Sequence, residues 1–301
     1  MLPRKHWVRR SEQLDPLRDN HQISLHVSAY DFPWDNTQAL SFALFRTYAV
    51  PSIGRLLDQT GEFTGRVQKR YDDTGLLLEE VQRHGFGSDR GRTAVRRINQ
   101  MHAMYDISND DMRYVLSTFV VVPKRWMDDY GFRPLSPNEV AATTNYYLEL
   151  GRRMAIKDMP EEYAGFERLL EDYEREHFAF DAGGRRVADS TLDLMTTFPP
   201  NNYAPKWLVK RFAFSLMDEP LLRAFRYPIP TRFERALFNG AMWLRARLLR
   251  LFPARSEPKW VSTFGYYRTY PADYEIEQLG TFPGGGGCPV HPRTETDDAA
   301  S

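Results

Sequence analysis

One histidine lies where it can do chemistry inside a folded protein. His102 falls in residues 88–106, where apolar residues recur at the three- and four-residue spacing of one helical face. An imidazole on such a face points toward the interior, either as a buried histidine satisfied by a carbonyl or carboxylate, or as a metal ligand. The spacing alone leaves both alternatives open. The residues that share its face are Val95, Ile98, Met101 and Tyr105.

The composition limits the metal that this histidine can bind. The chain has one cysteine, Cys288, which excludes an internal disulfide and the cysteine-rich zinc and iron–sulfur sites. Since no second histidine is nearby, an axial ligand of haem suits His102 better than a zinc ligand does. Cys288 itself precedes Pro289 after four glycines, and a chance Cys-Pro pair explains it better than a regulatory haem site.

Haem also requires cations for its propionates and an apolar slot for its ring. Nineteen Phe and ten Met residues make the slot easy to build. Two basic groups come before the histidine in the sequence, although ordinary surface charge accounts for most of their members. These groups are Arg66, Lys69 and Arg70, and Arg92, Arg96 and Arg97.

A helical di-iron site is the rival metal centre. It takes Glu-x-x-His from each of two helices, and Glu174 with His177 forms one such pair. A second pair is missing, because Asn99 stands three residues before His102. The sequence also has no G-x-S-x-G elbow, no phosphate-binding glycine loop and no H-E-x-x-H helix.

The charge balance and hydropathy pattern narrow the possible partners. Forty basic against forty acidic residues give no overall field for nucleic acid. No apolar run approaches the roughly 18 residues that span a bilayer, and residues 1–18 lack the apolar core of a secretory signal. We therefore expect a globular protein of the cytoplasm.

The elements that must position His102 are predicted to be helices. Ser108 with Asp111, and Ser136 with Glu139, have the spacing of capping boxes and mark two helix starts. The first helix is expected to stop at Pro123. Helices are also predicted over about 37–58, 74–83, 137–154 and 160–177. Turn-forming residues gather at the ends of the chain, so we predict an all-α, single globular helical domain over 37–255, with irregular extensions at 1–36 and 256–301 and a disordered tail after residue 283.

Residues 231–252 predict a basic amphipathic helix with an N-cap at Thr231. Its apolar residues include Phe233, Leu237 and Trp243, interspersed with five arginines. Such a helix either makes peripheral contact with an anionic membrane or docks on the core with its arginines in water.

An ordered set of motifs resembles a known oxygenase family. The run Lys-Arg-Tyr-Asp-Asp-Thr at 69–74 is followed by Ile-Asn-Gln-Met-His-Ala-Met-Tyr-Asp-Ile-Ser at 98–108 and by Asp-Asp-Met-Arg-Tyr-Val-Leu-Ser at 110–117. The pattern continues through 130–133, Glu139 and 151–156. Together they resemble the family that includes the fungal MpaB oxygenases and the bacterial latex-clearing rubber oxygenases. The resemblance covers about 53–180, and more loosely reaches residue 253.

This resemblance implies a helical fold wrapped around a haem b pocket. His102, in the Asn-x-x-His segment that starts at Asn99, would be the proximal iron ligand. Arg70 and Thr74 match the Arg-x-x-x-Thr element on the other side of the haem and are the expected catalytic residues. Arg70 would stabilise charge on oxygen or pair with a propionate. The expected cofactor-binding residues are His102, Arg70, Arg97 and Asn99.

The implied activity is O2-dependent oxidative cleavage of a C=C bond in a lipophilic, isoprenoid-like substrate. Two departures separate this chain from the rubber-cleaving branch. Asp73 stands where that branch can carry a distal lysine, and the chain lacks an export signal, so a small lipophile is the expected substrate. The alternatives are a non-catalytic protein that binds or senses haem, and a structural helical protein with a buried His102.

Overall fold

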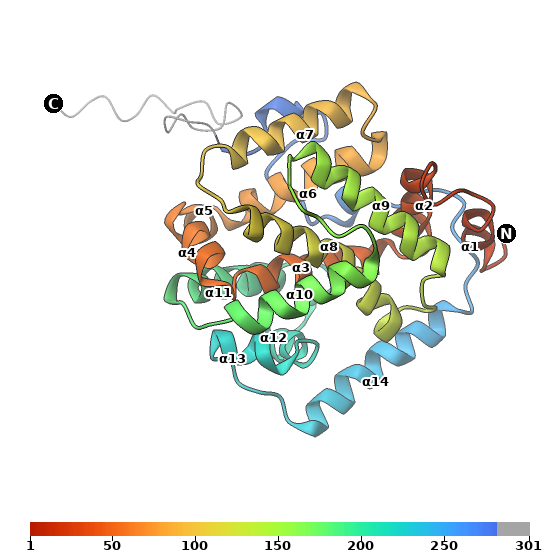
Figure 1. Ribbon diagram of the computed structural model, residues 1–301. Coiled ribbons are helices and arrows are strands. Elements are labelled where there is room, and N and C mark those ends of the chain that lie inside the picture. The colour runs from red at the N-terminus through yellow and green to blue at the C-terminus, as the bar shows by residue number, and fades with distance from the viewer. Residues whose placement is uncertain (282–301) are drawn as a thin grey trace.

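The computed structural model describes residues 1–281, which fold into helices joined by short connections (Figure 1). This confirms the all-α prediction, because the described residues contain no sheet and one isolated bridge between Leu2 and Ala254. The α-helices are α1 (His6–Ser11), α2 (Asn20–Leu25), α3 (Pro33–Thr47), α4 (Pro51–Gln59), α5 (Glu62–Gly65), α6 (Val67–His84), α7 (Asp89–His102), α8 (Asn109–Tyr130), α9 (Pro137–Arg153), α10 (Tyr163–His177), α11 (Ala182–Met195), α12 (Lys206–Ser215), α13 (Glu219–Phe225) and α14 (Arg232–Leu249). A π-helix, η1 (His26–Asp31), joins α2 to α3, and short 3-10 turns lie at Asn201–Tyr203, Val261–Phe264 and Ile276–Gln278.

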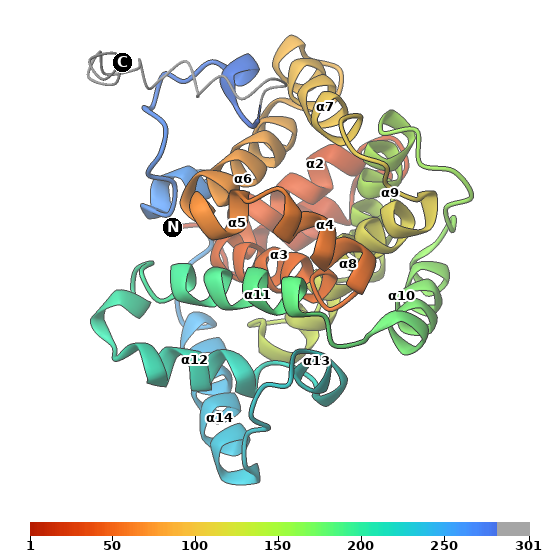
Figure 2. The same ribbon diagram turned by 90° about the vertical axis from the view of Figure 1, so that its left-hand side faces the viewer.

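The helices form two tiers. Figure 2 shows α11, α12 and α14 below the tier that contains α3, α4 and α8. Helix α8 packs against α3, α9, α10 and α14, so it is the central element of the fold. Within the described residues, none of the helices combines the length and the apolar character that crossing a bilayer requires.

Side-chain caps begin the helices where the sequence predicted. Ser136 and Glu139 form a reciprocal capping box, in which the Glu139 carboxylate accepts from the Ser136 N–H at 2.9 Å. Ser108 Oγ accepts from the N–H of Asp111 at 3.0 Å. The second half of that box is absent, because the Asp111 carboxylate accepts from Ser52 Oγ at 2.9 Å and from Tyr173 at 3.0 Å instead. Asp111 thus ties α8 to its neighbours.

The prediction that the first of these helices stops at Pro123 is wrong. Helix α8 continues to Tyr130 with Pro123 inside it. A proline inside a helix costs roughly 3 kcal/mol, since it removes one hydrogen bond and crowds the preceding turn. The residues after Pro123 compensate for this free-energy cost. Trp126 and Met127 are buried, and Trp126 Nε1 donates to Asp35 at 3.2 Å. Burial of two large side chains outweighs the local penalty.

Other predicted helix boundaries also differ from the observed ones. The helix expected over 37–58 is two helices, because Pro51 disfavours helical geometry at Val50, which is extended. The helix expected over 74–83 starts earlier, at Val67. Helix α7 ends at His102, not at Asp106, so Tyr105 is not on the helical face and is exposed. His102 is therefore the last residue of its helix.

The segment after residue 255 packs on α6 and α7. Buried Lys69 donates to Asp73 and to the carbonyl of Gly280, both at 2.8 Å, and the N–H of Gly280 donates to Asp73 at 2.9 Å. We call residues 266–281 the C-terminal strap. The predicted disordered tail and the Cys288–Pro289 pair lie outside the described residues.

Candidate functional site

A cavity of about 590 Å³ lies among α3, α4, α6, α7, α8, α9 and α11. This volume is within the range of small-molecule sites, roughly 300–1,000 Å³. The strap contributes to its wall through Tyr267 and Thr281. Apolar side chains supply most of the surface, including Leu44, Phe63, Ile98, Met112, Val115, Phe119 and Leu150. The cavity therefore suits an apolar ligand held by a few polar groups.

His102 is one of the polar side chains in the cavity wall. Its Nδ1 atom is buried and has no hydrogen-bond partner among the described residues. Burial, and then the positive charge of Arg70, lower the pKa of His102 to about 4. The imidazole is thus neutral at pH 7, and its Nδ1 has no partner among the described residues.

This finding bears on the two roles considered for His102. A histidine satisfied by a carbonyl or carboxylate would have its ring nitrogens paired, and the expected partner that fixes the ring is not found at Nδ1. A buried polar atom without a partner costs roughly 1–3 kcal/mol, so a purely structural role, in which the protein satisfies both ring nitrogens, does not account for His102.

Arg70 lies on the same cavity, on α6. Its Nη1 donates to Oγ1 of Thr74, one turn later, and its guanidinium lies 5.4 Å from the centre of the Phe63 ring. Arg70 makes no ion pair with any residue that the structure describes. By contrast, two other cations of the wall, Arg55 and Lys124, pair with Asp181 and Asp128. Arg70 and Lys259, which lies 4.8 Å from the centre of the Phe264 ring, are thus the cations of the wall that have no carboxylate partner among the described residues.

Tyr48 and Tyr71 also line the cavity, and the sequence did not single them out. Burial raises the pKa of Tyr48 to about 12, and its hydroxyl is bonded to Thr191. The hydroxyl of Tyr71 lies 3.5 Å from Ser41 Oγ, and burial raises its pKa as well. Both phenols therefore stay protonated and can donate. The sequence spacing did not predict a role for these two tyrosines, because they come together only when α3, α6 and α11 pack in the fold.

Two residues predicted to bind the cofactor do not line this cavity. Arg97 donates to the carbonyl oxygens of Leu279 and Thr281, at 2.7 and 2.6 Å, so it holds the C-terminal strap. Asn99 donates to the carbonyl of Arg153 at 2.9 Å, which joins α7 to α9. The structure brings His102, Arg70 and Thr74 together in the cavity wall. Arg97 and Asn99 lie on α7 but outside this wall.

Most of the other basic residues considered for the haem propionates are paired with carboxylates. Lys69 is paired with Asp73 beneath the strap, Arg66 with Glu62, and Arg92 with Asp89. Arg96 is exposed. Asp73, at the position where a distal lysine occurs in the rubber-cleaving branch, is held by the strap and by Lys69.

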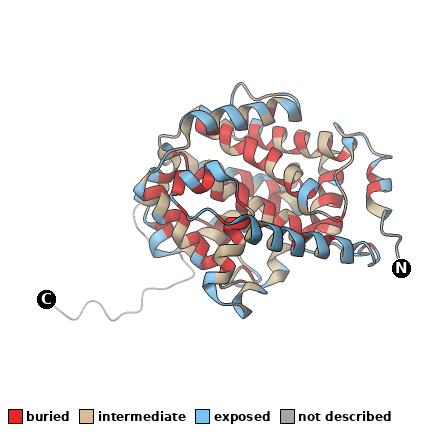
Figure 3. Cartoon of the chain, turned by 90° about the horizontal axis from the view of Figure 1, so that it is seen from below, coloured by how far each residue is buried: buried red, intermediate tan, exposed pale blue. Residues whose placement is uncertain are grey.

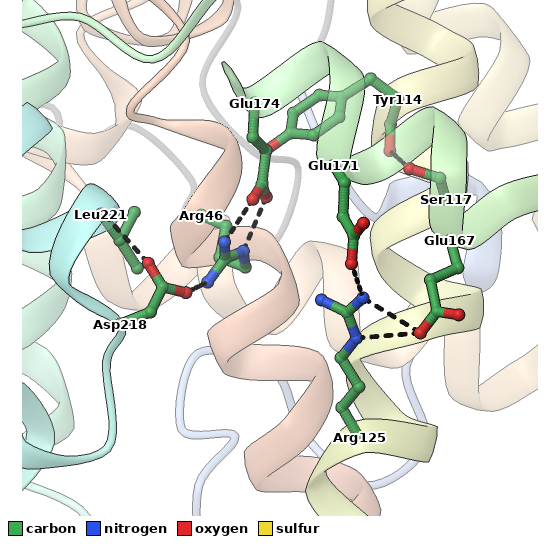
Figure 4. A network of polar contacts seen from close by, with 9 residues as sticks. All are labelled: Arg46, Tyr114, Ser117, Arg125, Glu167, Glu171, Glu174, Asp218 and Leu221. Carbon is green, nitrogen blue, oxygen red and sulfur yellow. Dashed lines mark hydrogen bonds and ion pairs between the residues drawn. The ribbon is translucent and has the colours of Figure 1, made fainter.

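The Glu-x-x-His pair considered for a di-iron site has another role. Figure 4 shows both carboxylate oxygens of Glu174 on Arg46, which also reaches Asp218. Tyr114 donates to the same carboxylate at 3.2 Å, and His177 packs on Tyr173 with ring centres 4.1 Å apart. Among residues 1–281, no three His, Cys, Asp or Glu side chains are grouped to hold a metal ion. Glu174 joins α3, α8 and α10 instead.

The fold and the cavity together define a helical protein with an internal apolar site that holds one unsatisfied imidazole and one available arginine. Residues 31–247 match the family described as ER-bound oxygenase mpaB/B'/Rubber oxygenase, catalytic domain. Since the match covers most of the chain, the protein belongs to this oxygenase family, which confirms the resemblance drawn from the motifs. The domain boundaries at residues 36 and 255 stay a prediction.

Curated relatives agree with this assignment. The chain is 29% identical over 252 residues to the ER-bound oxygenase mpaB' of Penicillium brevicompactum, covering 77% of this chain and 59% of that protein. It is 29% identical over 246 residues to the ER-bound oxygenase mpaB of Penicillium roqueforti (strain FM164), covering 75% of this chain and 82% of the relative. The chain thus spans less than two thirds of the first relative and most of the second.

Proposed function

We propose that this protein is a haem b-dependent oxygenase that cleaves a C=C bond of a lipophilic, isoprenoid-like substrate with O2. The observation that carries the proposal is that His102 lines the cavity and that its Nδ1 is bound by no carbonyl or carboxylate among the described residues. A neutral imidazole is the form that binds iron, and the lowered pKa keeps His102 in that form. Membership of an oxygenase family supports the reaction class.

The residues of the cavity fit haem. Its ring requires apolar walls, its iron an axial nitrogen, and its propionates a cation; the cavity offers all three through its aliphatic lining, His102 and Arg70. When bound, haem supplies the redox chemistry that activates dioxygen. His102 would hold the iron, while Arg97 and Asn99 act as positioning residues that fix α7 against the strap and α9.

Arg70 would either pair with a propionate or, together with Thr74, serve the oxygen side of the reaction. Thr74 Oγ1 accepts from Arg70, which orients the guanidinium, and the low dielectric of the cavity strengthens its field. A fixed cation of this kind stabilises negative charge that develops on oxygen during cleavage. Tyr48, protonated at neutral pH, is a second donor in the same wall. Both oxygen atoms of O2 would end in the two carbonyl products, so the cleavage needs no external reductant.

The substrate site would be the apolar remainder of the cavity. Its lining is largely apolar, which favours a hydrocarbon chain. We propose a small lipophile in place of a polymer, with the protein acting from the cytoplasm or at a membrane surface. The relatives are named ER-bound oxygenases, which is compatible with action at a membrane.

The absorption spectrum tests the cofactor. Purified protein supplemented with haemin is expected to show a Soret band that His102→Ala shifts or abolishes. His177→Ala is the matched control, since His177 packs on Tyr173 and does not line the cavity. A wild-type protein without a Soret band, or a band identical in His102→Ala, would overturn haem ligation by His102.

Oxygen consumption separates an enzyme from a haem-binding protein. The haem-loaded protein is expected to consume O2 with unsaturated isoprenoids and to release carbonyl products, but not with their saturated counterparts. A normal Soret band with no uptake across the panel would favour the non-catalytic alternative.

A further inference from the structure

Helix α14 presents an unusual face to solvent. Its inner side docks on the protein through buried Met242 and Ala246, and Arg245 donates to both carboxylate oxygens of Asp35 at 2.8 and 3.0 Å. Phe238 packs on Phe212 with ring centres 5.4 Å apart. These contacts fix the orientation of the helix, so the opposite side must face outward.

That outward side is apolar. Its residues recur at three-, four- and seven-residue spacing, which places them in one row along the helix. Phe233 is 74% exposed and Leu251, just past the helix end, is 80% exposed. Viewed from below, from the side on which α14 lies in Figure 1, a long and mostly exposed helix crosses the face (Figure 3). The outer row is Phe233, Leu237, Leu244, Leu248 and Leu251.

The apolar side of α14 faces away from the protein, which is the reverse of the usual arrangement in a surface helix that docks on the core. Such a helix normally turns its apolar stripe to the core and its charges to water. Here the buried residues number two, and five large apolar side chains stand in solvent along one side; the four within the helix, from Phe233 to Leu248, extend over about 22 Å at 1.5 Å per residue. Single exposed hydrophobic residues need no explanation, but a contiguous row marks an interaction surface.

The charges beside the row are almost all positive. Residues 232–255 contain six arginines and one acidic residue, Glu234. Glu234 is already bound by Arg211 and caps the helix with Thr231, so it offers no free negative charge. Arg232 and Arg247 are exposed, and Arg247 lies over the Trp243 ring at 4.8 Å. The surface thus combines an apolar row with a cationic, aromatic border.

We propose that the outer row of α14 docks on an anionic membrane surface, with α14 lying parallel to the bilayer. Apolar side chains of such a helix enter the boundary between headgroups and acyl chains, while arginines reach back to lipid phosphates. Trp243 suits the interface, because an indole has an apolar body and a polar N–H. A second copy fits this surface poorly, since symmetric pairing of two α14 helices would bring arginines against arginines.

Vesicle flotation tests the proposal with the full chain. The probe is phosphatidylcholine vesicles with and without phosphatidylserine. Wild type is expected to float with the anionic vesicles and to dissociate in high salt. Leu237→Ser with Leu244→Ser is expected to lower binding by about tenfold or more, since two inserted side chains are lost. Arg232→Gln with Arg247→Gln leaves the apolar row intact and is expected to remove the preference for phosphatidylserine.

Leu17→Ser is the matched control, because Leu17 is at least as exposed as Leu237 and Leu244 but lies far from α14 in sequence and outside the outer row. Circular dichroism checks that each variant is folded. The proposal is overturned if wild type does not float with anionic vesicles, or if Leu17→Ser weakens binding as much as the double variant. It is also overturned if wild type forms a dimer that the leucine variant dissociates while vesicle binding is absent.

Discussion

Arg70 donates from Nη1 to Oγ1 of Thr74, one turn further along α6, and both side chains line the internal cavity. The pair therefore behaves as one unit: the hydroxyl fixes the arginine, and the arginine carries the charge. No carboxylate among the described residues neutralises Arg70. Its positive charge acts on the cavity and helps to keep His102 neutral.

Removing the hydroxyl that fixes Arg70 should weaken haem binding. In Thr74→Val the shape is kept and the acceptor is lost, so the guanidinium is no longer held in place. A hydrogen bond to a charged group contributes about 1.5–3 kcal/mol, which predicts a rise of roughly tenfold to a hundredfold in the dissociation constant for haemin. Titration of the Soret band measures it, with Thr74→Ser as the conservative control. Equal affinities of the Val and Ser variants would contradict this role.

Breaking the Arg46–Glu174 pair should destabilise the whole fold. Side-chain exposure is 14% for Arg46 and 10% for Glu174, and Glu174→Ala leaves the arginine charge largely buried without its main partner. Loss of one member of a buried pair costs about 3–5 kcal/mol. Glu167→Ala, at the more exposed Arg125 pair in Figure 4, should cost less than about 1 kcal/mol. Urea unfolding compares them, and similar losses in the two variants would refute the distinction.

Two glycines should respond in opposite directions to alanine. A Cβ on Gly54 would come 2.4 Å from the carbonyl oxygen of Tyr48 and 2.7 Å from Cα of Gly184, where α4 crosses α11. Gly54→Ala is expected to cost about 1–3 kcal/mol, because backbone must move. Gly240, in α14, has open space around it, so Gly240→Ala is expected to gain about 0.5–1 kcal/mol. Thermal unfolding measures both, and a stabilised Gly54→Ala would show that the helices can separate freely.

The stability of the apoprotein should fall in mild acid because of His26. Burial, and then the charge of Arg10, lower the pKa of His26 to about 4 in the folded state, whereas the unfolded value is near 6.5. Between pH 6.5 and 4 the unfolded chain binds a proton that the folded chain does not, so the free energy of unfolding rises with pH in this window. The contribution lost by pH 4 is on the order of 3 kcal/mol.

His26→Asn removes the titrating group and retains a polar partner for Ser11, which lies 3.0 Å from Nδ1 of His26. Urea unfolding at pH 7, 5.5 and 4 should give a shallower pH dependence in this variant than in wild type. Identical slopes would mean that the pKa of His26 is the same in the folded and unfolded states.

Local chemistry made the helix starts predictable. Ser88, Ser108, Ser136 and Thr231 all cap helices, because a hydroxyl that accepts an N–H three residues later requires no distant contact. The continuation of α8 past Pro123 was not predictable, since the burial of Trp126 against α3 decides it. Helix interiors and caps are set by near neighbours, whereas continuation through a proline depends on tertiary packing.

The candidate site was predictable only in its central residues. His102 could be found from its apolar face, and Arg70 and Thr74 from the family motif. Arg97 was expected to reach the cofactor, but its guanidinium binds carbonyls of the strap some 180 residues away, a contact that no local pattern encodes. Tyr48 was not predicted for a similar reason. It lies at the break between α3 and α4 and contacts Thr191 of α11, which is distant in sequence.

The strap also sets the order in which the cavity can be assembled. Lys69 bonds to Gly280 across 211 residues of sequence, and Thr281 is part of the cavity wall. During synthesis, α6 and α7 leave the ribosome long before the residues that cover them. The cavity therefore stays open on this side while the helical body forms, and the last described segment to be synthesised is the one that closes it.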